Sequence, residues 1–220
     1  MTRVLVVLGK NIKSAMANRD ELLLKIKEEV LNLKASLLYK DRVKNKMFPV
    51  IGEGSHEAEI MFVGEAPGKN EAATGRPFCG ASGRILTQMI ESIGLKREDV
   101  YITNVVKDRP PDNRDPLPEE ISLYAPFLDR QIEILQPKVI ATLGRYSMAY
   151  IMNKFGLAAE LKSISQIHGK IFEVKAGYGN VKIITLYHPA VALYQNSLKA
   201  EMFKDFEIIE TIGAKDREIN

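Results

Sequence analysis

Three short apolar runs in this chain are each followed at once by polar residues that could do chemistry. The segments after the runs are Gly64-Glu65-Ala66-Pro67-Gly68, Thr103-Asn104 and Tyr187-His188-Pro189, and a loop with Gly75-Arg76-Pro77-Phe78 follows the first of them. A carboxylate can hold a proton or a water, an amide can pair with the edge of a planar ligand, and an imidazole can donate a proton. If the runs are neighbouring parallel strands, Glu65, Asn104 and His188 face one crevice at the carboxyl edge of the sheet.

Each of these features also has an ordinary structural interpretation. A glycine-rich strand-to-helix turn is commonly only a turn, an asparagine at a strand end often caps, and a histidine before proline is often a structural residue. The coincidence of all three at one predicted edge nevertheless favours a functional site.

The rest of the pattern supplies the elements that must position these side chains. Continuous apolar runs predict buried strands at Ile60–Val63, Val100–Val106 and Val139–Leu143, and a hairpin at Lys170–Val174 and Val181–Leu186 with its turn at Gly177–Gly179. Helical spacing and caps predict helices that begin near Asn18, Ser82, Pro118 and Tyr146, with a last one at about Ser197 to Ile212, and Met47 to Glu59 is a predicted loop. This order predicts a single three-layer α/β/α sandwich with a mostly parallel sheet over residues 1–220. Residues 1–20 form an extra N-terminal segment, in which Val4 to Leu8 predicts a strand.

Composition excludes several classes of protein. The chain has 220 residues, with 31 Lys and Arg against 28 Asp and Glu, so its net charge of +3 neither requires nor excludes a nucleic-acid partner. One cysteine, Cys79, excludes internal disulfides, all-cysteine zinc sites and four-thiolate iron–sulfur clusters. No window approaches the ~20 apolar residues that span a membrane, and a single thiol suits a reducing cytosol, so we expect a cytoplasmic protein.

The motifs together closely resemble the thermophilic family 4 uracil-DNA glycosylases. The matching segments are GEAPG at Gly64–Gly68, TGRPFCG at Thr74–Gly80, ITNVVKDRPPDNRDPLPEE at Ile102–Glu120 and YHPA at Tyr187–Ala190. The resemblance runs from about residue 24 to 212, in the family's order and spacing. It implies a monofunctional enzyme of base excision repair that hydrolyses the N-glycosidic bond of uracil in DNA and leaves an abasic site, acting as a monomer on DNA, with repair or replication proteins as further partners.

The resemblance also implies roles for individual residues. Phe78 is the ring on which the flipped uracil stacks, Asn104 reads the uracil edge, and His188 approaches uracil O2. Gly64, Ala66 and Gly68 complete the substrate pocket, and Ala66 stands where related glycosylases outside the family have an aspartate. Glu71 occupies an acidic position beside the pocket, where it could orient water, stabilise the cationic sugar or exclude the 5-methyl group of thymine. Glu65 has either a chemical role or caps the amides of its own turn.

DNA contacts are expected from the loops at the same edge. We expect Arg76, Lys107, Arg109 and Arg114 to reach phosphates, and Leu193 with Tyr194 to form a wedge for the gap that the flipped base leaves. Leu193 could instead begin the packing of the last helix.

The chain departs from the family at the four cysteines that hold its [4Fe–4S] cluster. The corresponding positions are Leu33, Ser36, Asp108 and Tyr124, so the sequence predicts neither the cluster nor any other cofactor or metal. We expect Leu33 and Tyr124 to replace it by packing and Ser36 and Asp108 by hydrogen bonds, with Cys79 as a small apolar filler. Two alternatives to the uracil hydrolase stay open. One is a catalytically silent module that binds uracil-DNA or single-stranded DNA, and the other is a glycosylase for hypoxanthine or xanthine.

Overall fold

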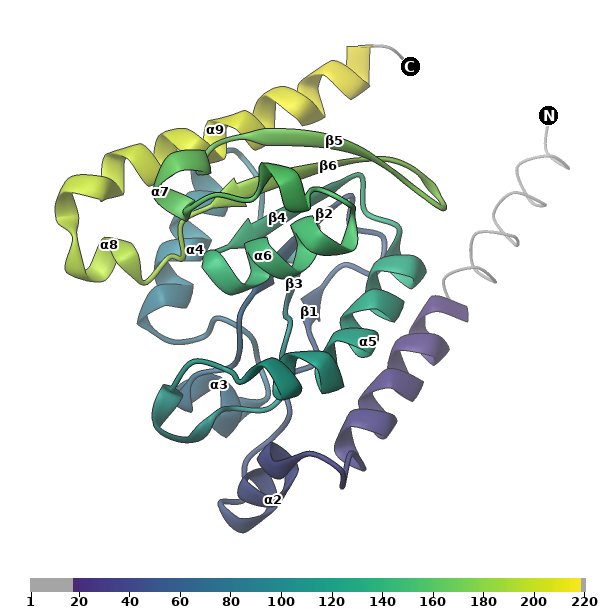
Figure 1. Cartoon of the computed structure of the whole chain (residues 1–220). Helices are drawn as coiled ribbons and strands as arrows, with labels where there is room; N and C mark the ends of the chain where they lie inside the picture. Colours follow the sequence, from purple (N-terminus) through teal and green to yellow (C-terminus); the bar gives the residue numbers. More distant parts are fainter. Residues whose placement is uncertain (1–17, 219–220) are drawn as a thin grey trace, which may run out of the picture.

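A computed structural model describes residues 18–218, with side chains placed to residue 209. Its centre is a six-stranded sheet in the order β1-β3-β2-β4-β6-β5 (Figure 1). The strands are β1 Glu53–Gly54, β2 Ile60–Gly64, β3 Tyr101–Asn104, β4 Val139–Leu143, β5 Ile171–Ala176 and β6 Gly179–Leu186. The four inner strands are parallel and the two edge strands are antiparallel, which confirms the predicted α/β fold with a mostly parallel sheet.

Helices lie on both faces of this sheet. A first helix over 18–31 lies along α5, and an ion pair between Glu29 and Arg130 joins the two (Figure 1). The other helices are α2 Leu37–Lys44, α3 Lys69–Thr74, α4 Ala81–Ser92, α5 Pro118–Leu135, α6 Arg145–Lys154, α7 Ile164–Ile167, α8 Val191–Tyr194 and α9 Asn196–Glu218. Short 3-10 turns occupy Arg97–Asp99, Pro111–Asn113 and Ala158–Glu160.

The core divides into two apolar layers because successive strand residues point to opposite faces. Met61 and Val63 pack with the first helix, α5 and α6, whereas Phe62 packs with α4 and α9, where its ring stacks on Phe206. Both faces of the inner strands are therefore covered, which explains why their sequences are continuous apolar runs and not alternating ones. The layers hold the carboxyl ends of β2, β3 and β6 level with one another.

The structure corrects some predicted boundaries. The predicted strand Val100–Val106 is shorter, although Val105 and Val106 still donate to the carbonyls of Gly64 and Glu65. The predicted loop from Met47 to Glu59 contains the two residues of β1. The prediction that Ser82 caps α4 is wrong: Gly80 is the N-cap. The predicted strand at Val4–Leu8 lies outside the described residues. Among the helices of residues 18–218, none combines the length and apolar character that a membrane crossing requires.

Candidate active site

The three predicted strand ends meet at one pocket of about 490 Å³. The wall is formed by Glu65, Ala66, Pro67, Gly68, Glu71, Phe78, Ser82, Asn104, Pro110, Asn113, Arg114, Asp115, His188, Ala190 and Tyr194. The parallel register pairs Gly64 with Asn104, so the loop after β2 and the end of β3 lie side by side. The sheet thus brings together the carboxylate, amide and imidazole that the sequence places far apart.

Asn104 presents an unsatisfied acceptor at the base of the pocket. Its side chain is only 1% exposed, and its Oδ1 is the one buried side-chain polar atom without a hydrogen-bond partner in the described part of the chain. Such an orphaned acceptor costs about 1–3 kcal/mol in the absence of a donor. A ligand N–H that reaches Oδ1 removes this cost, which makes the atom a recognition point.

His188 is held as a neutral ring with one free donor. Burial lowers its pKa to about 4, although the charge of Glu71 opposes the shift. Its Nδ1 accepts a hydrogen bond of 3.1 Å from the backbone N–H of Ala190, so the ring proton lies on Nε2. Gly144, at the end of β4, makes room for this ring, since a Cβ there would lie 3.1 Å from the Cβ of His188. The ring of Phe78 lies 5.6 Å from that of His188, centroid to centroid.

The loop that carries Phe78 is fixed by a carboxylate. Glu71 Oε1 accepts hydrogen bonds of 2.9 Å from the backbone N–H groups of both Cys79 and Gly80, at the positive end of α4. Phe78 itself adopts a φ of +48°, a left-handed conformation that is uncommon for a bulky residue. Gly83 admits this loop, because a Cβ at that position would overlap the carbonyl of Phe78.

Gly64 supports the same ring from below. A Cβ at Gly64 would lie 2.6 Å from Cζ of Phe78 and would also overlap Asn104 Oδ1. The main chain at Gly64 therefore lies directly against both the Phe78 ring and the side chain of Asn104. Any larger residue at this position would displace the Phe78 ring or the Asn104 side chain.

Glu65, in the pocket wall, has a raised pKa. Burial and the nearby charge of Asp115 raise its pKa to about 7, and Arg145 partly opposes them. Its carboxylate makes no hydrogen bond in the described part of the chain, so it does not cap its own turn. Glu71, in contrast, uses one oxygen for the Phe78 loop.

The predicted DNA contacts are distributed unevenly. Arg114 and Tyr194 line the pocket; Arg114 pairs with Glu120, and Tyr194 is 85% exposed at the rim. Arg76 lies outside the pocket wall and pairs with Glu53 at 2.7 Å. Leu193 is 43% exposed beside Tyr194. Their contacts with DNA stay predictions.

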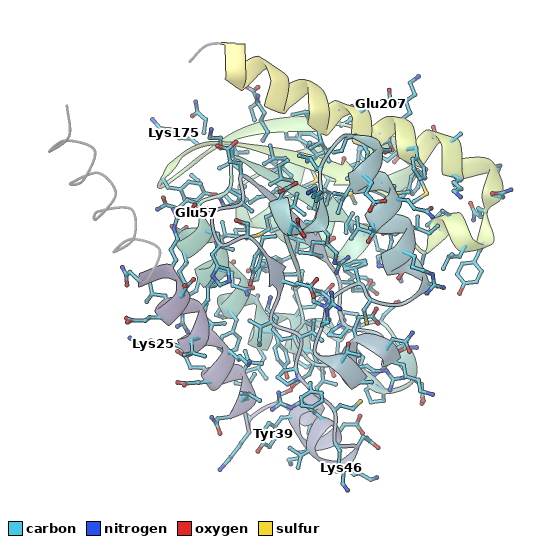
Figure 2. The ribbon with its side chains drawn as sticks, turned by 180° about the vertical axis from the view of Figure 1, so that it is seen from behind. Lys25, Tyr39, Lys46, Glu57, Lys175 and Glu207 are labelled. Carbon is cyan, nitrogen blue, oxygen red and sulfur yellow. The ribbon has the colours of Figure 1, made fainter. Side chains whose placement is uncertain are left out.

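Arg109 belongs to a second, basic hollow beside the pocket. Its Nε donates to Asn113, which also lines the pocket. Three lysines share the hollow with it, Lys44, Lys46 and Lys69, against two aspartates, Asp41 and Asp112. Figure 2 shows Lys46 at the end of the molecule that α2 forms. The basic surface therefore extends from the pocket toward α2, a direction that the motifs alone did not indicate.

The expectation that Lys107 reaches a phosphate is wrong. Lys107 is fully buried, and its ammonium nitrogen contacts Thr103, Asn104 and Gln131 inside the protein. It lies beneath the strand end that carries Asn104 because the chain turns inward after β3 to pack Val105 and Val106 in the core.

The four positions of the family's cysteines come together, as a hydrogen-bonded and packed cluster. The hydroxyl of Tyr124 donates to Asp108 Oδ2 at 2.6 Å and lies 2.9 Å from the hydroxyl of Ser36, and Arg42 pairs with Asp108 Oδ1 at 3.2 Å. Leu33 packs against the adjoining core. Hydroxyl, carboxylate and alkyl groups do not fit a [4Fe–4S] cluster, which needs thiolates. Among the described residues no group of three or more His, Cys, Asp or Glu side chains could hold a metal ion.

Cys79 lies apart from that cluster, in the Phe78 loop. It is half-buried, and its Sγ lies 3.3 Å from the hydroxyl of Thr74. The predicted role as an apolar filler is therefore only partly met, because one of its contacts is polar.

Sequence reasoning missed several wall residues. Pro110, Asn113 and Asp115 come from the loop between β3 and α5, whose path no periodic pattern reveals. Gly144, which makes room for His188, could have been found from the sequence. It follows a buried strand and precedes a helix, and Gly64 likewise follows a buried strand.

Comparison with known proteins identifies the class to which this fold and pocket belong. Residues 51–208 match the family model described as the uracil DNA glycosylase superfamily. That range contains the sheet, the Phe78 loop and all three strand-end groups of the pocket.

Individual relatives narrow the class. The chain is 49% identical over 190 residues to a type-4 uracil-DNA glycosylase of Sulfurisphaera tokodaii, covering 86% of this chain and 84% of the relative. It is 49% identical over 175 residues to that of Archaeoglobus fulgidus (80% and 87%) and 38% identical over 203 residues to that of Thermotoga maritima (91% and 100%). The chain therefore belongs to the type-4 uracil-DNA glycosylases.

Proposed function

We propose that this protein hydrolyses the N-glycosidic bond of uracil in DNA, releasing uracil and leaving an abasic site. The relatives named type-4 uracil-DNA glycosylase support the activity. The single observation that carries it for this chain is the orphaned Oδ1 of Asn104 beside a neutral, donating His188. We further propose that the protein acts as a monomer in the cytoplasm, together with other repair or replication proteins.

Recognition begins with a base turned out of the DNA stack. Its ring stacks on Phe78, and Asn104 Oδ1 accepts from uracil N3–H while the side-chain NH₂ donates to O4. Cytosine has an acceptor and a donor in the reverse order, so the same amide meets it with two mismatched groups. A 5-methyl group points at the wall that contains Glu71 and Ala66, which disfavours thymine.

Cleavage moves the bonding electrons of the glycosidic bond onto the base, while water adds to C1′ of the sugar and loses a proton, which balances the negative charge of the departing uracil. The Nε2–H of His188 donates to O2, where negative charge grows, and acts as an oxyanion-hole donor. A neutral imidazole suits this role because its pKa, lowered to about 4, keeps it uncharged at neutral pH. No lysine in the motifs is placed to form a Schiff base, so the DNA strand stays intact.

The carboxylates of Glu65 and Glu71 have different roles in the reaction. Glu65 has both oxygens free at the pocket wall, so we assign it to orienting the attacking water and stabilising the cationic sugar. Glu71 positions the Phe78 loop through Oε1, and its charge faces the same pocket.

The test uses labelled single- and double-stranded oligonucleotides with one uracil. Incubation followed by alkali should give the shorter product, and His188→Ala should lower the single-turnover rate by roughly 10²–10³ with DNA affinity changed no more than a few-fold. Specific binding without release of uracil from the wild type would replace the hydrolase with the silent binding module. Release of hypoxanthine or xanthine in preference to uracil would establish the other alternative.

A further inference from the structure

Lys107 is a buried lysine whose every partner accepts a hydrogen bond. Its Nζ lies 2.6 Å from the backbone oxygen of Asn104, 2.6 Å from Gln131 Oε1 and 2.8 Å from Thr103 Oγ1. All three partners are neutral. This arrangement places the nitrogen directly beneath the residue that reads the base.

The neighbouring bonds fix each partner as an acceptor. Gln131 Nε2 donates to the carbonyl of Ile51 and to the hydroxyl of Tyr101, so Oε1 must be the atom that faces Lys107. The Thr103 hydroxyl has two acceptors for its proton, the carbonyl of Ile51 at 2.6 Å and Gln131 Oε1 at 3.3 Å, and with either of them it offers Lys107 a lone pair. A backbone carbonyl can only accept.

Three acceptors require three N–H donors, which an ammonium has and a neutral amine lacks. Burial lowers the pKa of Lys107, but loss of its proton would turn a lone pair toward one of the three oxygens. The hydrogen-bond geometry therefore favours the charged form. A buried positive charge without a carboxylate partner acts over a longer distance than a charge in water.

We propose that Lys107 is a positioning residue for Asn104 whose ammonium form also favours departure of the base as an anion. The inference rests on the proposed function. Its nitrogen holds the backbone of Asn104, and the anionic ring that forms during cleavage sits on the other side of the same residue. Effective dielectric values near 20 make such a charge worth roughly tenfold in rate.

Two substitutions test the charge. Lys107→Met removes the charge together with its hydrogen bonds, whereas Gln131→Glu keeps an acceptor on Nζ and places a carboxylate beside it, with loss of the hydrogen bonds that Nε2 donates to Ile51 and Tyr101. Tyr150→Phe is the control, because it removes the 2.7 Å hydrogen bond to Asp129 and neither residue lines the pocket. Single-turnover release of uracil and of 5-fluorouracil is measured for each protein. Fluorine withdraws electrons, so 5-fluorouracil leaves as a more stable anion. Its release therefore depends less on stabilisation by a nearby positive charge.

We expect Lys107→Met and Gln131→Glu to slow uracil release at least tenfold and 5-fluorouracil release several-fold less, with Tyr150→Phe unchanged on both. Equal losses on the two bases, or no loss, would overturn the inference while the proposed function stands. A wild type that releases neither base would overturn both.

A second measurement does not depend on activity or on a foldable Lys107→Met. In protein labelled with ¹⁵N-lysine, Nζ of Lys107 at pH 7 should have the chemical shift of an ammonium and should be the lysine signal most perturbed by Gln131→Glu. A neutral amine at that pH would contradict the proposal.

Discussion

At the scale of single residues, the pocket depends on a few atoms whose partners are already fixed. His188 is committed to one tautomer by Ala190, whereas Asn104 Oδ1 has no partner inside the protein. The first feature prepares a donor for the leaving base, and the second leaves an acceptor for its N3–H. Recognition and chemistry thus use different side chains.

Asn104→Asp should exchange one base preference for another. A carboxylate presents an acceptor where an NH₂ faced O4, which suits the amino group of cytosine better than uracil. Uracil release should fall at least tenfold, equivalent to about 1.4 kcal/mol. Parallel assays on uracil and cytosine oligonucleotides measure both changes, and undiminished uracil release would show that Asn104 does not read the base.

The raised pKa of Glu65 predicts a pH dependence. Its pKa of about 7 means that the carboxylate needed for the reaction is lost as pH falls below 7, so the single-turnover rate should rise between pH 6 and 8. Glu65→Gln should have a lower single-turnover rate, and that rate should no longer rise between pH 6 and 8. If the rate of Glu65→Gln rose with pH in the same way as that of the wild type, the titrating group would be a residue other than Glu65.

The raised pKa of Glu65 also makes the stability of the folded protein depend on pH. Between pH 4.5 and about 7 the folded protein binds a proton at Glu65 that the unfolded chain has lost, so the contribution of this group to stability falls as pH rises through that range. Replacement by glutamine removes this pH dependence.

At the scale of elements, α4 and the loop before it form one unit. Glu71→Ala removes the acceptor for Cys79 and Gly80, so the Phe78 loop loses its hold and both DNA affinity and rate should fall. Glu71→Gln keeps an oxygen acceptor and should restore affinity. Fluorescence anisotropy with uracil DNA and single-turnover rates, measured on both variants, separate loop positioning from charge. Equal affinities for the two variants would argue against a positioning role.

The strands were predictable from the sequence, whereas the burial of one side chain and the cap of one helix were not. The strands Ile60–Gly64 and Val139–Leu143 were predictable because burial on both faces requires continuous apolar runs. The burial of Lys107 was not, because a lysine after a strand looks the same in sequence whether it points inward or outward. The cap of α4 was missed for a related reason: its oxygen comes from Glu71, nine residues before Gly80.

At the scale of the whole molecule, the hydrogen-bonded cluster of Ser36, Arg42, Asp108 and Tyr124 joins distant parts of the chain. Ser36 precedes α2, Tyr124 lies in α5, and Asp108 follows β3, so the cluster links three segments that form one side of the fold. The sequence predicted the type of contact at Ser36 and Asp108, but it did not predict the contribution of Arg42.

This linkage leads to an expectation about metal. Purified protein should be colourless and should show no broad iron–sulfur absorbance, because one cysteine cannot supply four thiolates. Chelators should leave the melting temperature unchanged. Iron and sulfide present in stoichiometric amounts would contradict the prediction.

The supports of Phe78 bear on how such a pocket could acquire new substrates. Gly64 lies directly against the ring, Gly83 lies directly against the carbonyl of Phe78, and Glu71 holds the loop by its backbone. Room for a larger base therefore requires the backbone of the Phe78 loop to move, and not only a side chain. Laboratory selection for excision of bulky lesions should consequently enrich changes at Glu71, which release the loop, ahead of changes in the residues that touch the base, while Gly64 and Gly83 stay glycine.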